Sequence, residues 1–271
     1  MAKNDTASLV FDIESVADGE LIARLRYPGE KLDPHAAVKK YREELLVENG
    51  KDFIPYTYQL PVSLVVAKVS SSYQLMDLVA LDEKESRPHE IVRGFWEGWR
   101  RYNKPQLVSF NGRGFDMPLL ELAAFRFGIQ ITDWFAEHRR NFDQPRYRYN
   151  MSAHFDLHEW LTNNGASRFN GGLSLAANLI GKPGKMDVSG HMVQDLWDAG
   201  RANDIHDYCR ADVLDTYFVF LRSRVLVGEI SIKQEHERIE EARAWIERSA
   251  KEHPGLNRYL SAWGDWKSPW A

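Results

Sequence analysis

The sequence predicts an α/β fold, in which a mixed β-sheet is flanked by helices and followed by a helical C-terminal extension. Short apolar runs bounded by turn residues indicate strands, and longer runs with apolar residues at helical spacing indicate helices. They follow one another in the order strand, hairpin, helix, strand, helix, which is typical of layered α/β domains. The 271 residues, 44% hydrophobic and 27% charged, can bury roughly 70–75% of the unfolded surface.

The first half of the chain supplies the predicted sheet. Residues 8–14 are predicted to form a short apolar strand that ends in carboxylates. The polar segment 17–59, interrupted by prolines, is predicted to be an insertion with one helix near 35–48. Beyond it, two apolar runs separated by three serines predict a hairpin, an amphipathic run predicts a helix, and a further apolar run predicts the fourth strand. These elements are expected over residues 61–69, 73–81, 88–102 and 106–110.

Helices dominate the prediction for the second half of the chain. A glycine-bearing loop after the fourth strand leads into a helix near 117–127, and Asn203 is a suitable N-cap for a helix over 204–226. Ser231 and Gln234 have capping-box spacing and open a further charged helix. We therefore expect two units, a domain over 1–228 and a helical extension over 229–271.

Composition and charge exclude several classes of protein. A net charge of −4 and a pI near 6.2 argue against a protein that nucleic acid holds by bulk electrostatics alone. They allow an enzyme that meets phosphates through metal ions. The single cysteine, Cys209, rules out an intrachain disulfide and favours a cytoplasmic location. No apolar run approaches the roughly 20 residues that span a bilayer, so no membrane association is expected.

Two acidic residues end the first predicted strand. Asp12 and Glu14 are two residues apart, so both side chains leave the same face of a strand. Phe11 and Ile13 then point to the opposite face, into the core. Neighbouring carboxylates repel each other unless a cation lies between them, which suggests a metal site. The simpler interpretation is that one of the acids caps a neighbouring element.

Three later residues, two acids and a tyrosine, could belong to the same site. Asp116 follows the glycine-bearing loop and precedes a predicted helix, so it is either a helix N-cap or a third metal ligand at a strand-to-helix junction. Tyr208 and Asp212 are four residues apart in a predicted helix and share one of its faces, although tyrosines at this spacing are often structural. Four carboxylates without a cluster of Cys or His suit hard cations such as Mg²⁺ or Mn²⁺ rather than Zn²⁺.

Taken together, the three motifs resemble those of the DEDDy 3′–5′ exonucleases. The motifs are Asp12-Ile-Glu14, Asn111-Gly-Arg-Gly-Phe-Asp116 and Tyr208-Cys-Arg-Ala-Asp212. The likeness spans about residues 8–222 and is strongest to the predicted stand-alone exonucleases related to the proofreading domain of family B DNA polymerases. The histidine branch of this group would need a histidine five residues before Asp212. That position is Asp207, so the tyrosine branch is the better match.

The resemblance implies a ribonuclease H-like fold and hydrolysis of phosphodiester bonds at the 3′ end of single-stranded nucleic acid. It implies two divalent ions, Mg²⁺ or Mn²⁺, and release of 5′-mononucleotides. The residues themselves do not select DNA or RNA, whereas the resemblance favours DNA. The implied metal ligands are Asp12, Glu14, Asp116 and Asp212. Tyr208 would orient the attacking water, and Asn111 and Phe115 would contact the terminal nucleotide, although core packing explains Phe115 equally well.

A segment rich in arginine and aromatic residues, 137–150, is a second candidate for contact with nucleic acid. Arginines for phosphates and rings for base stacking bind single strands without sequence preference, so Arg146 and Arg148 are predicted to bind the substrate. The alternative is a solvated loop whose arginines cover apolar surface.

Two other classes of protein stay open for the whole chain. One is a non-catalytic nucleic-acid-binding or scaffold module that keeps the same fold. The other is an α/β protein whose acids are only caps and surface groups, which predicts that Asp12 and Asp212 lie far apart in space.

Overall fold

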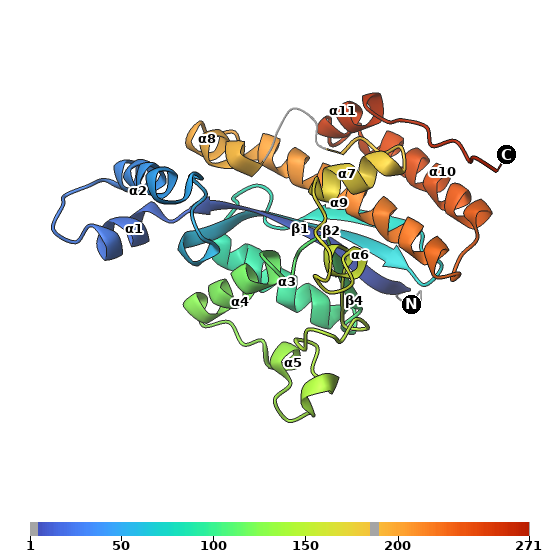
Figure 1. Cartoon of the computed structure of the whole chain (residues 1–271), viewed down its shortest axis with the longest axis horizontal. Coiled ribbons are helices and arrows are strands. Elements are labelled where there is room, and N and C mark those ends of the chain that lie inside the picture. The colour runs from blue at the N-terminus through green and yellow to red at the C-terminus, as the bar shows by residue number, and fades with distance from the viewer. Residues whose placement is uncertain (1–4, 185–189, 271) are drawn as a thin grey trace.

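A five-stranded mixed sheet lies at the centre of the molecule (Figure 1). The computed structural model describes residues 5–184 and 190–270. The strand order is β3-β2-β1-β4-β5; β1, β2 and β3 pair antiparallel, and β4 and β5 run parallel to β1. The strands are β1 (Thr6–Ala17), β2 (Gln59–Ser70), β3 (Leu75–Ala80), β4 (Gln106–Ser109) and β5 (His154–Asp156).

Helices cover both faces of this sheet (Figure 1). The α-helices are α1 (Gly19–Arg26), α2 (Pro34–Asn49), α3 (Pro88–Arg101), α4 (Asp116–Phe127), α5 (Thr132–Phe135), α6 (Leu157–Leu161), α7 (Gly172–Leu179), α8 (Val193–Asp198), α9 (Ala202–Leu226), α10 (Ile232–Ser249) and α11 (Gly255–Ser261). Short 3₁₀ turns occupy Tyr56–Tyr58, Asn141–Asp143 and Gly190–Met192. Among the described residues, no helix combines the length and apolar character needed to cross a membrane.

The alternation of side chains along β1 separates two hydrophobic cores. Phe11 and Ile13 pack into the core that contains Trp96 of α3 and Leu120 of α4. Val10 points to the opposite face and joins the core built on α9. Side chains two residues apart in a strand share a face, so Asp12 and Glu14 lie on the α9 side, as the sequence predicts.

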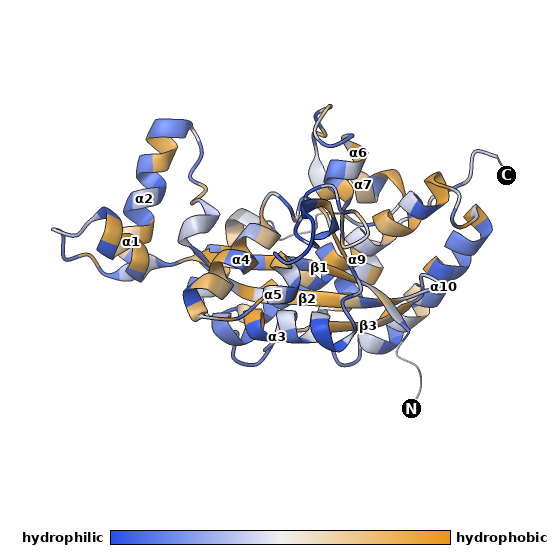
Figure 2. Ribbon diagram, turned by 90° about the horizontal axis from the view of Figure 1, so that it is seen from below, coloured by the Kyte–Doolittle hydropathy of each residue, from blue (hydrophilic) through white to orange (hydrophobic). Residues whose placement is uncertain are grey.

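The insertion between β1 and β2 differs from the prediction. It holds two helices, α1 and α2, where one was expected, and in Figure 1 they project beyond one end of the sheet. Asp18 and Asp33 cap them, each side chain accepting a hydrogen bond from a backbone N–H of the first turn. The pair buries a small core of its own around Ile22 and Tyr41. In Figure 2 the two helices stand apart from the orange, apolar sheet.

The structure also corrects three smaller expectations. β5 was missed because it contains only three residues, too few for a periodic pattern. The long helix α9 begins at Ala202 with Arg201 as its N-cap, so Asn203 lies within the first turn and is not the cap. A short helix, α11, follows Pro254 where no helix was expected. The capping box of Ser231 and Gln234 at the start of α10 is confirmed.

Candidate functional site

Three carboxylates from distant parts of the sequence meet where α9 crosses β1. One carboxylate oxygen of Asp12, one of Glu14 and one of Asp212 lie within 4.8 Å of one another. The pleat of β1 presents the first two on one face, and packing of α9 against that face brings the third to them. The α/β alternative in which Asp12 and Asp212 lie far apart is therefore wrong.

Asp116 is not one of the three residues whose oxygens meet within 4.8 Å, but it lies close enough for its charge to act on Asp12. It is the first residue of α4, is buried, and receives a hydrogen bond from the backbone N–H of Ile13, which lies between the two acids of β1. Phe115, not Asp116, occupies the N-cap position of α4. Asp116 is therefore not a plain N-cap, because it is the first helical residue and its carboxylate accepts a hydrogen bond from Ile13 of β1 as well as from its own backbone N–H.

The electrostatics of this cluster follow from burial and crowding. Desolvation raises the pKa of Asp12 well above its ordinary value, and the charges of Asp116, Glu14 and Asp212 raise it further. Burial also raises the pKa of Asp116 to about 7, with added repulsion from Asp156 and Asp212. Bringing such groups together in the charged form costs free energy that a cation can offset. A donor set made only of carboxylate oxygens fits a hard divalent cation.

Tyr208 lies one helical turn before Asp212 and forms a hydrogen bond with it. Its ring packs against Val16 of β1 and Ile205 of α9, and the side chain is buried. Burial, followed by repulsion from the charges of Asp212, Glu14 and Asp12, raises the pKa of the phenol far above its ordinary value. The hydroxyl therefore keeps its proton at neutral pH and acts as a hydrogen-bond donor.

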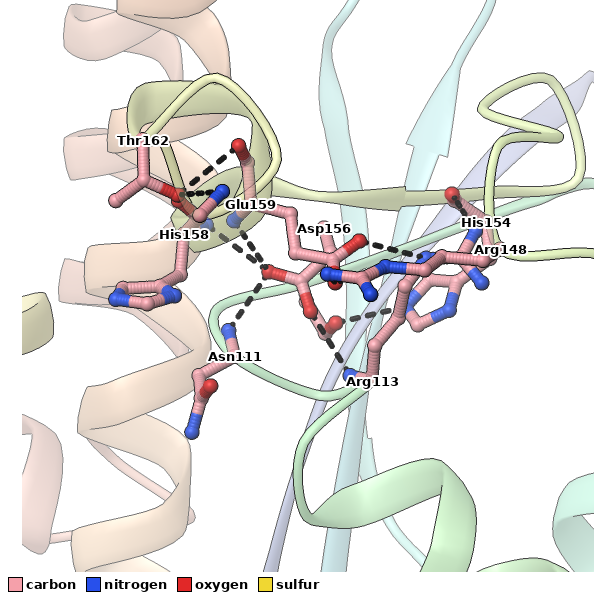
Figure 3. Close-up of polar contacts among 10 residues, drawn as sticks. Asn111, Arg113, Arg148, His154, Asp156, His158, Glu159 and Thr162 are labelled. Atoms are coloured by element: carbon pink, nitrogen blue, oxygen red, sulfur yellow. Dashed lines mark hydrogen bonds and ion pairs between the residues drawn. The ribbon is translucent and has the colours of Figure 1, made fainter. Parts of the chain in front are cut away.

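Asp156 anchors the loop that carries Asn111 and Phe115 (Figure 3). The two oxygens of this buried carboxylate accept the backbone N–H of Asn111 at 2.9 Å and of Arg113 at 2.8 Å. Asn111 has a positive φ of 65° and an exposed side chain, whereas Phe115 is half-buried with its ring 5.9 Å from that of Phe53. Core packing therefore accounts for part of the Phe115 side chain.

Asn111, Arg146 and Arg148 line one pocket of about 530 Å³. We call it the arginine pocket; its two walls come from residues 111–121 and residues 134–165. Both arginines are held by carboxylates of the same lining: Arg146 by Glu121 at 2.9 Å and Arg148 by Glu159 at 2.9 Å. The sequence analysis named these three residues as separate candidates, and the structure brings them to one pocket and shows that two of them form ion pairs.

The most important residue that sequence reasoning missed is Asp156. It ends β5 and caps α6, accepting the backbone N–H of His158 at 3.0 Å, in addition to holding the Asn111 loop. An acid at the end of an apolar run and before a helix is the available signal, but the run is very short. His154 and His158, four residues apart, are not part of the acidic cluster; His154 is buried and donates or accepts at Ser109.

The strand order and the placement of the acids at the central strand define a ribonuclease H-like α/β protein with an acidic centre. Among solved structures, the chain is similar to the family B DNA polymerase from the hyperthermophilic archaeon Pyrobaculum calidifontis. The TM-score is 0.51 and the sequence identity 15%, over 80% of this chain and 24% of the polymerase. The chain thus spans about a quarter of that protein, and the likeness establishes the fold alone.

The chain belongs to the family of predicted 3′–5′ exonucleases related to the exonuclease domain of PolB, whose family model matches residues 51–263. The match contains the second and third motifs. Asp12 and Glu14 precede it, so their assignment rests on their position beside Asp212. None of the curated proteins compared with the chain matches it.

Proposed function

We propose that this protein is a metal-dependent 3′–5′ exonuclease that removes 5′-mononucleotides from single-stranded nucleic acid, and from DNA in preference to RNA. The observation that carries the proposal is the meeting of Asp12, Glu14 and Asp212 oxygens within 4.8 Å, with Asp116 beside them. Membership of a family of predicted exonucleases gives the reaction class and its polarity. The relation of that family to a DNA polymerase domain favours DNA.

In this proposal the four carboxylates of Asp12, Glu14, Asp116 and Asp212 hold two divalent ions, Mg²⁺ or Mn²⁺. Bound ions supply an activated water and stabilise the negative charge that develops at the scissile phosphate. The rigid frame of β1, α4 and α9 fixes the carboxylates in advance, so little reorganisation is needed when the substrate arrives.

Tyr208 orients the attacking water in this proposal. Its hydroxyl donates a hydrogen bond to Asp212 and lies among the acids, so in this proposal it acts as a positioned donor and not as a strong base. Asn111 and Phe115, on the loop next to Asp116, contact the terminal nucleotide, and the arginine pocket receives the adjoining strand through Arg146 and Arg148. The single buried cysteine, Cys209, supports a location in the reducing cytoplasm.

The test is digestion of oligonucleotides labelled at the 3′ or the 5′ end, in the presence of Mg²⁺ or Mn²⁺. The wild-type protein should release the 3′ label at once as a mononucleotide and shorten the 5′-labelled strand stepwise. Asp12→Ala and Asp212→Asn should each lower the rate by at least about a hundredfold, since each removes a ligand oxygen from the centre.

Asp195→Asn is the matched control for Asp212→Asn. Asp195 lies on α8 with its side chain 74% exposed, so the same change of charge there should leave the rate unaltered. Equal activity in the wild type and both cluster variants would assign the activity to a contaminating nuclease. Specific strand binding by a wild-type protein without any metal-dependent cleavage would favour the alternative, a non-catalytic binding or scaffold module.

A further inference from the structure

The arginine pocket contains a carboxylate that is shared by two arginines. Glu159 of α6 pairs with Arg148 at 2.9 Å through one oxygen and with Arg113 at 3.5 Å through the other (Figure 3). Arg113 belongs to the loop that carries Asn111, and Arg148 comes from the opposite wall. The Glu159 side chain therefore bridges the two walls.

The two arginines differ in exposure and in the number of their contacts. The side chain of Arg113 is only 11% exposed, its guanidinium donates to the carbonyl of His154 at 2.7 Å, and its own backbone N–H is held by Asp156. The side chain of Arg148 is 54% exposed and is tied mainly by Glu159. One guanidinium is thus fixed in advance, while the other can adjust to a ligand.

Positive and negative charges balance at the arginine pocket in the free protein. Three arginines, Arg113, Arg146 and Arg148, face the carboxylates of Glu121 and Glu159, and the buried Asp156 carboxylate holds the Arg113 backbone N–H. A pocket with matched charges attracts a polyanion weakly. Guanidinium groups bind carboxylate and phosphate oxygens in the same forked geometry, so a position that holds a carboxylate between two arginines also suits a phosphate.

We propose that Arg113 and Arg148 form a binding site for a phosphodiester group of the substrate strand, and that Glu159 occupies this site as an internal competitor until the strand displaces it. The inference rests on the proposed function, because it names how the strand is held beside the acidic centre. It adds Arg113 as a strand-binding residue and gives Glu159 a role that lowers affinity.

The test is the affinity of a fluorescein-labelled oligothymidylate, measured by anisotropy over a salt series with millimolar Ca²⁺. Glu159→Gln keeps the shape of the side chain and removes the competing charge. It should tighten binding about threefold to tenfold, because no carboxylate has to be displaced, and it should steepen the log–log salt dependence by roughly 0.7, because no freed Glu159 charge takes up a cation when the strand binds. Arg148→Gln should weaken binding and flatten the salt dependence by about the same amount.

Glu247→Gln is the matched control. Glu247 lies on α10, which contributes nothing to the lining of the arginine pocket, and it also pairs with an arginine, Arg243 at 3.3 Å. The change in net charge is the same, so only a general charge effect would alter its affinity. In an Arg148→Gln background, Glu159→Gln should lose most of its effect, because the two side chains act on the same phosphate.

Three outcomes overturn the inference. One is unchanged or weaker strand binding by a Glu159→Gln protein whose melting temperature matches that of the wild type. Another is equal tightening by Glu247→Gln. The third is a gain from Glu159→Gln that is just as large in the Arg148→Gln background, because the two side chains would then not act on the same phosphate. Cleavage by the wild type is measured separately. If the wild type cleaves DNA and any of these results is obtained, only the proposed role of Glu159 as a competitor is refuted. An inactive wild type that binds no strand refutes the proposed function as well.

Discussion

The hydroxyl of Tyr259 in α11 donates a hydrogen bond of 2.7 Å to the carboxylate of Asp215 in α9, and both side chains are buried. Asp215 lies three residues after Asp212, on the helix that carries the third motif. Trp263, just after α11, packs against Phe218 of the same helix. The C-terminal helices α10 and α11 therefore pack against α9, the helix that carries the third motif.

Removing the Tyr259 hydroxyl should destabilise the protein without altering its surface. Tyr259→Phe removes one of the hydrogen-bond donors to the buried Asp215 carboxylate, which costs about 1–3 kcal/mol. Urea unfolding at neutral pH measures this free energy. Tyr149→Phe, at a side chain that is 56% exposed, is the matched control and should change the free energy of unfolding by less than about 0.5 kcal/mol. Equal effects of the two substitutions would mean that the buried hydrogen bond contributes nothing.

The raised pKa of Asp215 predicts how the free energy of unfolding depends on pH. Burial raises its pKa from 3.8 to about 7, so the folded protein keeps a proton there that the unfolded chain loses near pH 4. The unfolded state therefore binds fewer protons between about pH 4 and 7, and the contribution of Asp215 to stability falls as the pH rises through that window. Lys182 and Tyr259 face the carboxylate and partly offset the loss.

Asp215→Asn should remove this dependence, because the amide resembles the protonated acid. The measurement is urea unfolding with a chelator at about pH 5 and about pH 8. Between them the wild type should lose more free energy of unfolding than the variant, by about a few kcal/mol. The acids of the acidic centre are present in both proteins, so the difference between them reports Asp215 together with its repulsion from Asp212. Parallel curves for the two proteins would contradict the prediction.

A divalent ion at the acidic centre should stabilise the folded chain. Mn²⁺ at about a hundred times its dissociation constant adds roughly 2.7 kcal/mol by mass action, so the melting temperature of the wild type should rise. Asp212→Asn should show a clearly smaller rise, because one ligand of the cluster is lost. Asp195→Asn should behave as the wild type does. A rise of the same size in all three proteins would place the ion elsewhere.

The two exposed arginines of the arginine pocket should contribute to strand binding. Arg146→Ala with Arg148→Ala should weaken binding and reduce the slope of log affinity against log salt by about 1.4, roughly 0.7 for each phosphate contact. The matched control replaces Arg87 and Arg93, which are 50% and 55% exposed and also pair with acids. If the double variant binds the strand as tightly as the wild type at every salt concentration, the pocket is excluded as a strand-binding surface.

Local patterns in the sequence were sufficient for most of the elements and for the pairs within each motif. Asp12 and Glu14 share a strand face, and Tyr208 and Asp212 share a helix face, because the repeat of the backbone alone decides both. The capping box at Ser231 is local in the same way. Short elements such as β5 and α11 carry too few residues for a periodic signal, so they were missed.

Only the tertiary structure decided which of these local pairs meet. The crossing of α9 over β1 joins Asp212 to Asp12, and the approach of α4 adds Asp116, through packing between segments about one to two hundred residues apart in the chain. The same holds for Asp156 beneath the Asn111 loop and for Glu159 between two arginines. The sequence determined the chemistry that each side chain offers. The partners depend on long-range packing, which no pattern of neighbouring residues encodes.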